Sequence, residues 1–300
     1  MQTLMRRVTA LLLITMILIG VAAPGRALAG GNIGPREMLT LYYDNINARQ
    51  YESAFNQWIN PPDTYANFVA GYADTSFVSA YFGGFQPGYI GGIQGRVPGV
   101  LIGYHTDGGT VAYSGCYELA YNPGTTGIIQ WRIADGNFQP MGYVPTENAI
   151  PQVLDRSCYT NYLADGVYTS AQAMLVDYFS AVNRGDYVAA YSLWTQPRQT
   201  YDAFVAGWAT TTETVMFYGA YQFSGTYNAA ESGRVPVVLL GYHTDGSMEA
   251  YQGCIGVSYS AYATVRWSLW NAYLQPLPYT VTPDFASITA VLSASCYAGA

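Results

Sequence analysis

The spacing of apolar residues predicts an amphipathic helix near the start of the chain. The apolar positions follow the i, i+3, i+4, i+7 rule of a helix that buries one face. They are Leu39, Tyr42, Tyr43 and Ile46, and the pattern returns 136 residues later at Leu175, Tyr178, Phe179 and Val182. A helix therefore opens each of two similar segments.

Two shorter helices are expected after each of these. Apolar and aromatic positions recur at helical spacing over residues 51–58 and 187–194. Thr64 and Thr200 then stand where a third short helix would begin. A threonine hydroxyl can accept a hydrogen bond from a backbone N–H of the first turn, so both residues are expected to be N-caps.

The pattern then changes from helical to strand-like. Residues 97–106 and 235–244 read as strands, and an Asp-Gly pair, which is a strong hairpin signal, follows each of them. Further on, residues 129–133 and 265–269 alternate between apolar and polar side chains. Three helices followed by antiparallel strands predict an α+β unit with its helices on one face of a sheet.

The chain is one such unit written twice. Residues 95–108 return almost unchanged as residues 233–246, an offset of 138. We therefore predict two tandem domains, residues 30–160 and residues 161–300, each with three N-terminal helices packed on a curved antiparallel sheet.

The four cysteines obey the same offset. Cys116 and Cys158 of the first unit correspond to Cys254 and Cys296 of the second. Four cysteines allow three pairings, and the duplication selects one disulfide within each unit, Cys116–Cys158 and Cys254–Cys296. The chain-entropy account gives roughly 4 kcal/mol of stabilisation for a loop of this length.

The first 29 residues have the features of a secretory signal peptide. Arg6 and Arg7 precede an apolar run over residues 8–23, and small residues lead to a cleavage point after Ala29. The apolar run is shorter than the roughly 20 residues that a membrane span needs. We expect a secreted protein with no membrane anchor after cleavage, and the paired cysteines fit that compartment.

Charge and composition exclude several classes of binding partner. The chain has no lysine, and removal of the signal peptide would leave nine arginines against 19 carboxylates, a net charge of −10. Such a surface repels nucleic acid and anionic lipid. No cysteine or histidine spacing typical of zinc sites, phosphate loop or dinucleotide fingerprint is present, so no metal or cofactor is expected.

The order of elements resembles a known family. A helix with Tyr/Phe and Asn, a second with Ala-Tyr or Ala-Phe and Trp, a hairpin with Tyr-x-Gly-Cys and a late tryptophan strand are similar to the nuclear-transport-factor-2-like (SnoaL-like) superfamily. The resemblance implies a cone, in which a curved sheet wraps around helices and leaves a pocket at the open end. Tyr42 and Tyr178 would then lie near the pockets. Members include scytalone dehydratase, ketosteroid isomerase, limonene epoxide hydrolase and many exported domains.

His105 and His243 are the only histidines, and each stands two positions before the Asp-Gly turn. Histidine is suited to moving protons near neutral pH, which makes both residues candidate bases. The alternative is a structural role near a strand end. A catalytic role requires each ring to face the concave side within reach of a tyrosine or carboxylate, and the two units share no such carboxylate in sequence.

Arg96 and Arg234 are the other cationic residues that both units keep. A guanidinium can hold a ligand carboxylate through two hydrogen bonds, so both are candidate ligand-binding residues. The alternative is an ion pair at a sheet edge, which the sequence favours.

The absence of a shared catalytic set favours a non-catalytic exported binding or interaction protein, with an unknown small molecule or extracellular protein as partner. The alternative is a small-molecule lyase, isomerase or hydrolase with a pocket lined by tyrosine and histidine. Single domains of the resembled superfamily pair through the outer faces of their sheets. The resemblance therefore implies a monomer in which the two cones pair by a pseudo-twofold axis within one chain.

Overall fold

The computed structural model of the chain describes residues 33–88, 94–121, 131–155, 158, 170–227, 230–260, 267–277 and 285–297. The predicted signal peptide and the predicted boundary between residues 160 and 161 lie outside these residues. Within the described part, no helix is long and apolar enough to cross a membrane.

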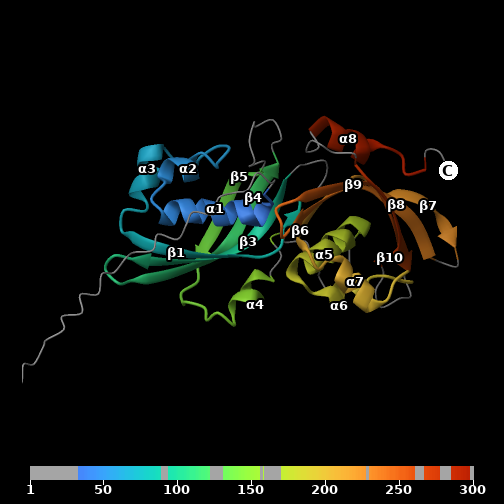
Figure 1. Cartoon of the computed structure of the whole chain (residues 1–300), viewed down its shortest axis with the longest axis horizontal. Helices are drawn as coiled ribbons and strands as arrows, with labels where there is room; N and C mark the ends of the chain where they lie inside the picture. The colour runs from blue at the N-terminus through green and yellow to red at the C-terminus, as the bar shows by residue number, and fades with distance from the viewer. Residues whose placement is uncertain are drawn as a thin grey trace, which may run out of the picture.

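The first unit contains helices, then strands, then one further helix (Figure 1). Its elements are α1 (Pro35–Asn47), α2 (Tyr51–Phe55), α3 (Tyr65–Ala70), β1 (Thr75–Phe82), β2 (Gln86–Pro87), β3 (Gln94–His105), β4 (Thr110–Tyr121), β5 (Trp131–Pro140) and α4 (Ile150–Leu154).

The second unit repeats this order. Its elements are α5 (Ala171–Arg184), α6 (Tyr187–Ser192), α7 (Tyr201–Gly207), β6 (Thr211–Tyr218), β7 (Gln222–Tyr227), β8 (Ala230–His243), β9 (Met248–Ser260), β10 (Trp267–Pro276) and α8 (Phe285–Ser293). The α+β prediction with two duplicated helix-and-sheet units is confirmed. The sequence analysis did not identify β1, β2, β6, β7, α4 or α8.

Capping residues mark the ends of several helices. Thr64 and Thr200 accept hydrogen bonds from the backbone N–H groups three residues on. Gly185 ends α5 in the left-handed conformation with φ of +74°, which glycine adopts without strain. Asp186 then caps α6 through Ala189 N–H. The predicted threonine caps are therefore confirmed.

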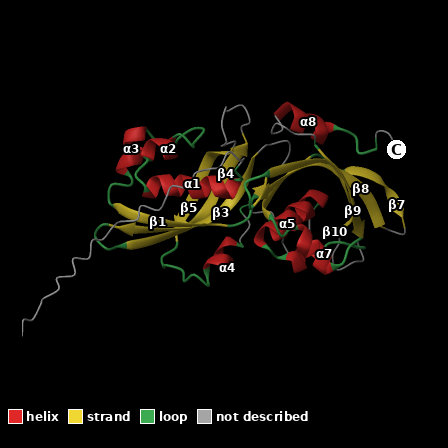
Figure 2. Ribbon diagram, viewed as in Figure 1, coloured by secondary structure: helices red, strands yellow, loops and turns green. Residues whose placement is uncertain are grey.

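Both sheets are antiparallel and curved. The strand orders are β1-β3-β4-β5 and β6-β8-β9-β10, with β2 and β7 pairing with β3 and β8. Irregularities in register interrupt the pairing at matching places in the two sheets, and such bulges bend and twist strands. Figure 2 shows the second sheet curving around α5 and α7.

An asparagine side chain hydrogen-bonds the first helix of each unit, α1 or α5, to an edge strand of its sheet. The Asn47 amide donates to Val78 C=O and accepts from Val78 N–H, at 2.9 and 2.8 Å. Asn183 does the same with Thr214, at 2.8 and 2.7 Å. These amides satisfy backbone groups of β1 and β6 that face the helices, and they fix each helix on the concave side of its sheet.

The two predicted disulfides are present. Cys116 is bonded to Cys158, and Cys254 to Cys296. Each ties the strand after the hairpin to the chain that follows the last helix of its unit.

One aromatic group joins the two units into a shared core. The Trp131 ring of the first unit stacks on Phe217 of the second, with centroids 6.3 Å apart and planes 13° apart. Its indole N–H donates to the Tyr242 hydroxyl at 3.0 Å. Trp131 is completely buried, and the cluster that contains it runs without interruption from α1 and β5 to the outer side of β6 and β8.

The contact between the units joins unlike surfaces. The first unit contributes the end of its cone, formed by Phe85, Tyr121 and Trp131, and the second contributes the outer face of its sheet. This differs from the expected pseudo-twofold pairing of two outer faces. The physical reason is the alternation along β6 and β8, which carry apolar side chains on both faces, so that the outer face needs an apolar partner.

Glu213 is buried at this contact, only 3% exposed. One carboxylate oxygen accepts the Arg36 backbone N–H at 3.0 Å, while the other has no hydrogen-bond partner among the described residues. Burial raises the pKa of Glu213, and the neighbouring Arg36 opposes that rise in pKa.

The raised pKa predicts the effect of Glu213→Gln on stability. The ionised carboxylate destabilises the folded state, so the cost is absent below the ordinary glutamate pKa and is complete once the pH has passed the raised folded pKa. We expect the Gln variant to have a higher urea midpoint than the original chain at pH 7, with a difference that shrinks in mild acid. The exposed Glu231→Gln is the control, and an equal difference at every pH would contradict the assignment.

Candidate functional site

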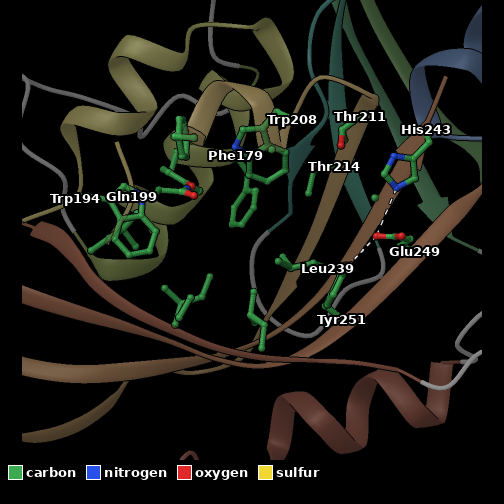
Figure 3. Close-up of a pocket in the computed structure, with 18 residues that line it drawn as sticks. Phe179, Trp194, Gln199, Trp208, Thr211, Thr214, Leu239, His243, Glu249 and Tyr251 are labelled. Atoms are coloured by element: carbon green, nitrogen blue, oxygen red, sulfur yellow. Dashed lines mark hydrogen bonds and ion pairs between the residues drawn. The ribbon is translucent and has the colours of Figure 1, made fainter. Parts of the chain in front are cut away.

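The second cone holds a cavity of about 460 Å³ between α5–α7 and the concave face of its sheet (Figure 3). Its walls are mostly aromatic and aliphatic, with a polar group on β8 and β9. The residues that line it include Tyr178, Phe179, Trp194, Phe204, Trp208, Thr211, Thr214, Leu239, His243, Glu249, Tyr251, Ile255, Leu269 and Leu274. A concave apolar site with a few converging polar groups is the usual form of a small-molecule site.

His243 lies at the polar side of this cavity. Its Nδ1 is 3.3 Å from the Thr210 hydroxyl, and its Nε2 is 3.7 Å from a Glu249 carboxylate oxygen. The second distance is too long for a hydrogen bond. The carboxylate therefore faces the ring without a hydrogen bond to Nε2.

Two buried polar atoms of the wall have no hydrogen-bond partner among the described residues. They are His243 Nε2 and the Thr214 hydroxyl. An unsatisfied buried polar atom costs about 1–3 kcal/mol, and because both atoms are buried in the wall, a bound molecule would gain that energy only if the side chain turned towards it. This pattern indicates a mostly apolar molecule with one or two polar atoms.

Glu249 also accepts a hydrogen bond from the Tyr251 hydroxyl, at 2.7 Å. This bond raises the pKa of Tyr251, because the neutral phenol is the form that donates to the carboxylate. His243, Glu249 and Tyr251 thus form a row along the cavity, with the carboxylate in the middle, as the dashed lines in Figure 3 show.

Tyr178 lies at the helical side. It is 5% exposed, and its hydroxyl accepts from the Trp194 indole N–H at 3.4 Å. Burial raises the pKa of Tyr178 to about 12, so this residue is a neutral phenol at physiological pH.

The first cone is filled at the place that corresponds to the inner part of this cavity. Tyr43 and Tyr117 meet there with their hydroxyl groups 2.5 Å apart, and Phe138 packs on Tyr117 with centroids 4.7 Å apart. Burial raises the pKa of both tyrosines far above the ordinary range. These aromatic side chains occupy the volume that is open in the second cone.

Three substitutions between the units explain the difference. Tyr43, Tyr117 and Phe138 correspond to Phe179, Ile255 and Leu274. The second unit therefore lacks two hydroxyls and two aromatic rings at these positions. The smaller side chains open the cavity within the same backbone.

The outer part of the cavity is kept in the first cone, as a depression of about 420 Å³ whose lining includes Tyr43, Leu101 and Tyr113, the counterparts of Phe179, Leu239 and Tyr251. His105 lines it, and His105 Nδ1 is 3.3 Å from an Asp74 carboxylate oxygen. Asp74 is largely exposed, with 72% of its side chain accessible, so this ion pair contributes little to stability.

The predicted candidates fall into two groups. His105, His243 and Tyr178 line cavities, and each histidine lies on the concave side beside a carboxylate, as a catalytic role requires. Tyr42 is buried under its neighbours, 2% exposed, with its hydroxyl 3.4 Å from that of Tyr72, and it does not line the first depression.

Like Tyr42, the two arginines do not line these cavities. Arg96 donates to Cys158 C=O at 3.0 Å and to Glu118, and Arg234 donates to Cys296 C=O at 2.8 Å. Arg234 also lies between the rings of Tyr273 and Tyr297. These contacts hold the disulfide-bonded segment against the sheet, and the ion-pair interpretation agrees with the Arg96–Glu118 contact.

Sequence reasoning missed the partners of the histidines. Asp74 and Thr210 occupy the same position in the two units, and both lie beside histidine Nδ1. They differ in residue type, so a search for shared carboxylates passes over them. Glu249 corresponds to Val111, and its even spacing from Tyr251 and its place opposite Gly241 in the hairpin were the available signals.

No protein-family profile and no curated protein matches the chain. Among solved structures, a proposed aromatic ring hydroxylase of Novosphingobium aromaticivorans is 15% identical, with a TM-score of 0.29, over 35% of this chain and 90% of that chain. A similarity at this level carries no functional argument. Among the described residues, no three His, Cys, Asp or Glu side chains are grouped to hold a metal ion.

The hydrogen bond to Glu249 predicts a measurable change at Tyr251. Glu249→Gln should lower the pKa of Tyr251 towards the ordinary tyrosine value, because the charged acceptor is removed. Carbon NMR of labelled tyrosine can follow this titration, with Tyr251→Phe used to assign the signal. An unchanged Tyr251 titration would show that the two side chains do not interact in solution.

Proposed function

We propose that this is an exported binding protein built from two nuclear-transport-factor-2-like (SnoaL-like) units, in which the second cone binds a small, mostly apolar molecule. The observation that carries the proposal is the apolar cavity with two unsatisfied polar atoms, His243 Nε2 and the Thr214 hydroxyl. The disulfides support an extracytoplasmic setting. The first cone keeps only the outer part of this cavity, because Tyr43, Tyr117 and Phe138 fill its inner part.

The polar row gives the ligand an orientation. A ligand oxygen or nitrogen would bond to His243 Nε2 once the ring turns towards the cavity, while the rest of the molecule packs between Phe179, Trp194 and Trp208. Glu249 beside the ring favours a ligand group that is neutral or cationic, because an anionic group would meet the carboxylate.

Acid–base catalysis is the second candidate function, and the His243–Glu249 pair is the observation that favours it. A carboxylate near an imidazole can stabilise the protonated ring after it has taken a proton from a substrate. The reaction would then be a lyase, isomerase or hydrolase reaction on a small molecule. Mass spectrometry of the molecule that copurifies with the protein separates the two functions. A binding protein returns it unchanged, whereas a catalyst converts it and loses that conversion in His243→Gln.

Exchanging residues between the units tests the binding site directly. The fluorescent apolar probe N-phenyl-1-naphthylamine is titrated into the mature chain. Ile255→Tyr with Leu274→Phe places the side chains of the first cone in the second, and it should weaken probe binding at least tenfold by filling the cavity.

The reverse exchange is the matched control. Tyr43→Phe, Tyr117→Ile and Phe138→Leu give the first cone the residues of the second, and they should add a second binding site for the probe. Full probe affinity in the filled variant, with its unfolding midpoint preserved, would place the site elsewhere.

A further inference from the structure

Each unit has two surfaces that the contact between units could use. The first is a cone end, formed by Phe85, Tyr121 and Trp131 in the first unit and by Tyr221, Tyr259 and Trp267 in the second. The other is an outer sheet face, marked by Phe77 and Tyr104 in the first unit and by Glu213 and Tyr242 in the second. The fold joins the first cone end to the second outer face. The second cone end and the first outer face remain outside this contact.

The second cone end has the same arrangement as the first. Trp267 packs against Tyr221 and Tyr259 at 5.4 and 5.1 Å, as Trp131 packs against Phe85 and Tyr121 at 5.1 Å each. The rings beside Trp131 are only 1% and 2% exposed, whereas Tyr221 and Tyr259 are partly exposed.

The outer face of the first sheet is covered by α4 at Val100 and Ile102, and beside this it is apolar and exposed. Phe77 and Tyr104 are 49% and 38% exposed, and their rings lie 6.3 Å apart. The corresponding Glu213 and Tyr242 are each 3% exposed beneath the first unit.

The hydrogen bond that joins the units has a counterpart donor and a counterpart acceptor on the unused surfaces. Trp131 N–H donates to the Tyr242 hydroxyl within the chain. Trp267 is the counterpart of Trp131, and Tyr104 is the counterpart of Tyr242. Among the described residues, neither the Trp267 indole N–H nor the Tyr104 hydroxyl has a hydrogen-bond partner.

The charges have changed together on the two unused surfaces. Inside the chain, Arg36 of the first unit lies against the buried Glu213. The counterpart of Arg36 is Gln172, and the counterpart of Glu213 is Phe77. A contact between the unused surfaces would therefore bury no counterpart of the Glu213 carboxylate.

From this correspondence we propose that the unused surfaces bind each other between molecules, so that the second cone end of one chain docks on the first outer face of another. The occupant of the Phe77–Tyr104 face is a second copy of this protein. Such a contact joins unlike surfaces and leaves one of each free, so association continues head to tail unless it closes into a ring. This differs from the monomer expected from sequence, in which all pairing surfaces are used within the chain.

Complementary variants test this proposal by sedimentation velocity on the mature chain, from low micromolar to millimolar concentration. The original chain should show a mass that rises past that of two chains. Phe77→Asp on the outer face and Tyr259→Asp on the cone end should each stay at the mass of one chain. An equimolar mixture of these two variants should form pairs and grow no further, because it contains one functional contact per pair.

Two results would overturn the proposal. The first is a single-chain mass for the original protein at every concentration. The second is association of the Tyr259→Asp variant alone, which would mean that like faces pair. Tyr104→Asp and Tyr221→Asp are the second variants of each surface. Equal unfolding midpoints across the set show that the loss of association is not a loss of folding.

Discussion

The packing of Trp131 against Phe217 and Tyr242 is the contact on which the rest of the molecule depends. It converts the outer face of the second sheet into an interior surface, so β6 and β8 are buried on both sides. Buried aromatic area of this kind is a main source of stability in folded proteins. The two units therefore share one core across their junction, although each also has helices, a sheet and a disulfide of its own.

Duplication gave the two units the same frame, and a few side chains gave them different interiors. The asparagine hydrogen bonds, the threonine caps, the arginine contacts to the disulfide segment and the tryptophan strands occur in both. Because these contacts hold the backbone, the two units keep the same fold although the second has Ile255 at the position of Tyr117 and Leu274 at the position of Phe138. The cavity of the second cone reaches inwards to Ile255 and Leu274, whereas aromatic side chains limit that of the first cone to its outer part.

Much of the fold follows from the sequence because its patterns are local. Helical spacing, threonine caps, Asp-Gly turns and the cysteine offset each act over a few residues or repeat at a fixed distance, and the structure confirms them. The packing between the units uses the outer face of β6, and the sequence pattern did not predict β6 as a strand. Buried on both faces, it lacks the alternation that marks a half-exposed strand.

The site was less predictable for a related reason. The histidines and Tyr178 could be selected from residue type and duplication, but the partners of the histidines are brought to them by the hairpin and by the turn before the first strand. The size of the cavity depends on side-chain volumes at three positions that lie far apart in sequence. Comparison of the two units reveals these positions only when the structure shows that they meet.

The central claim is that the two units are joined by a shared core, and the coincidence of their unfolding transitions tests it most directly. Probes placed on β3 of the first unit and on β9 of the second report each unit separately during urea unfolding of the mature chain. A shared core predicts one cooperative transition with the same midpoint for both probes, which Trp131→Ala should separate into two. Two separate transitions in the original chain would contradict the account.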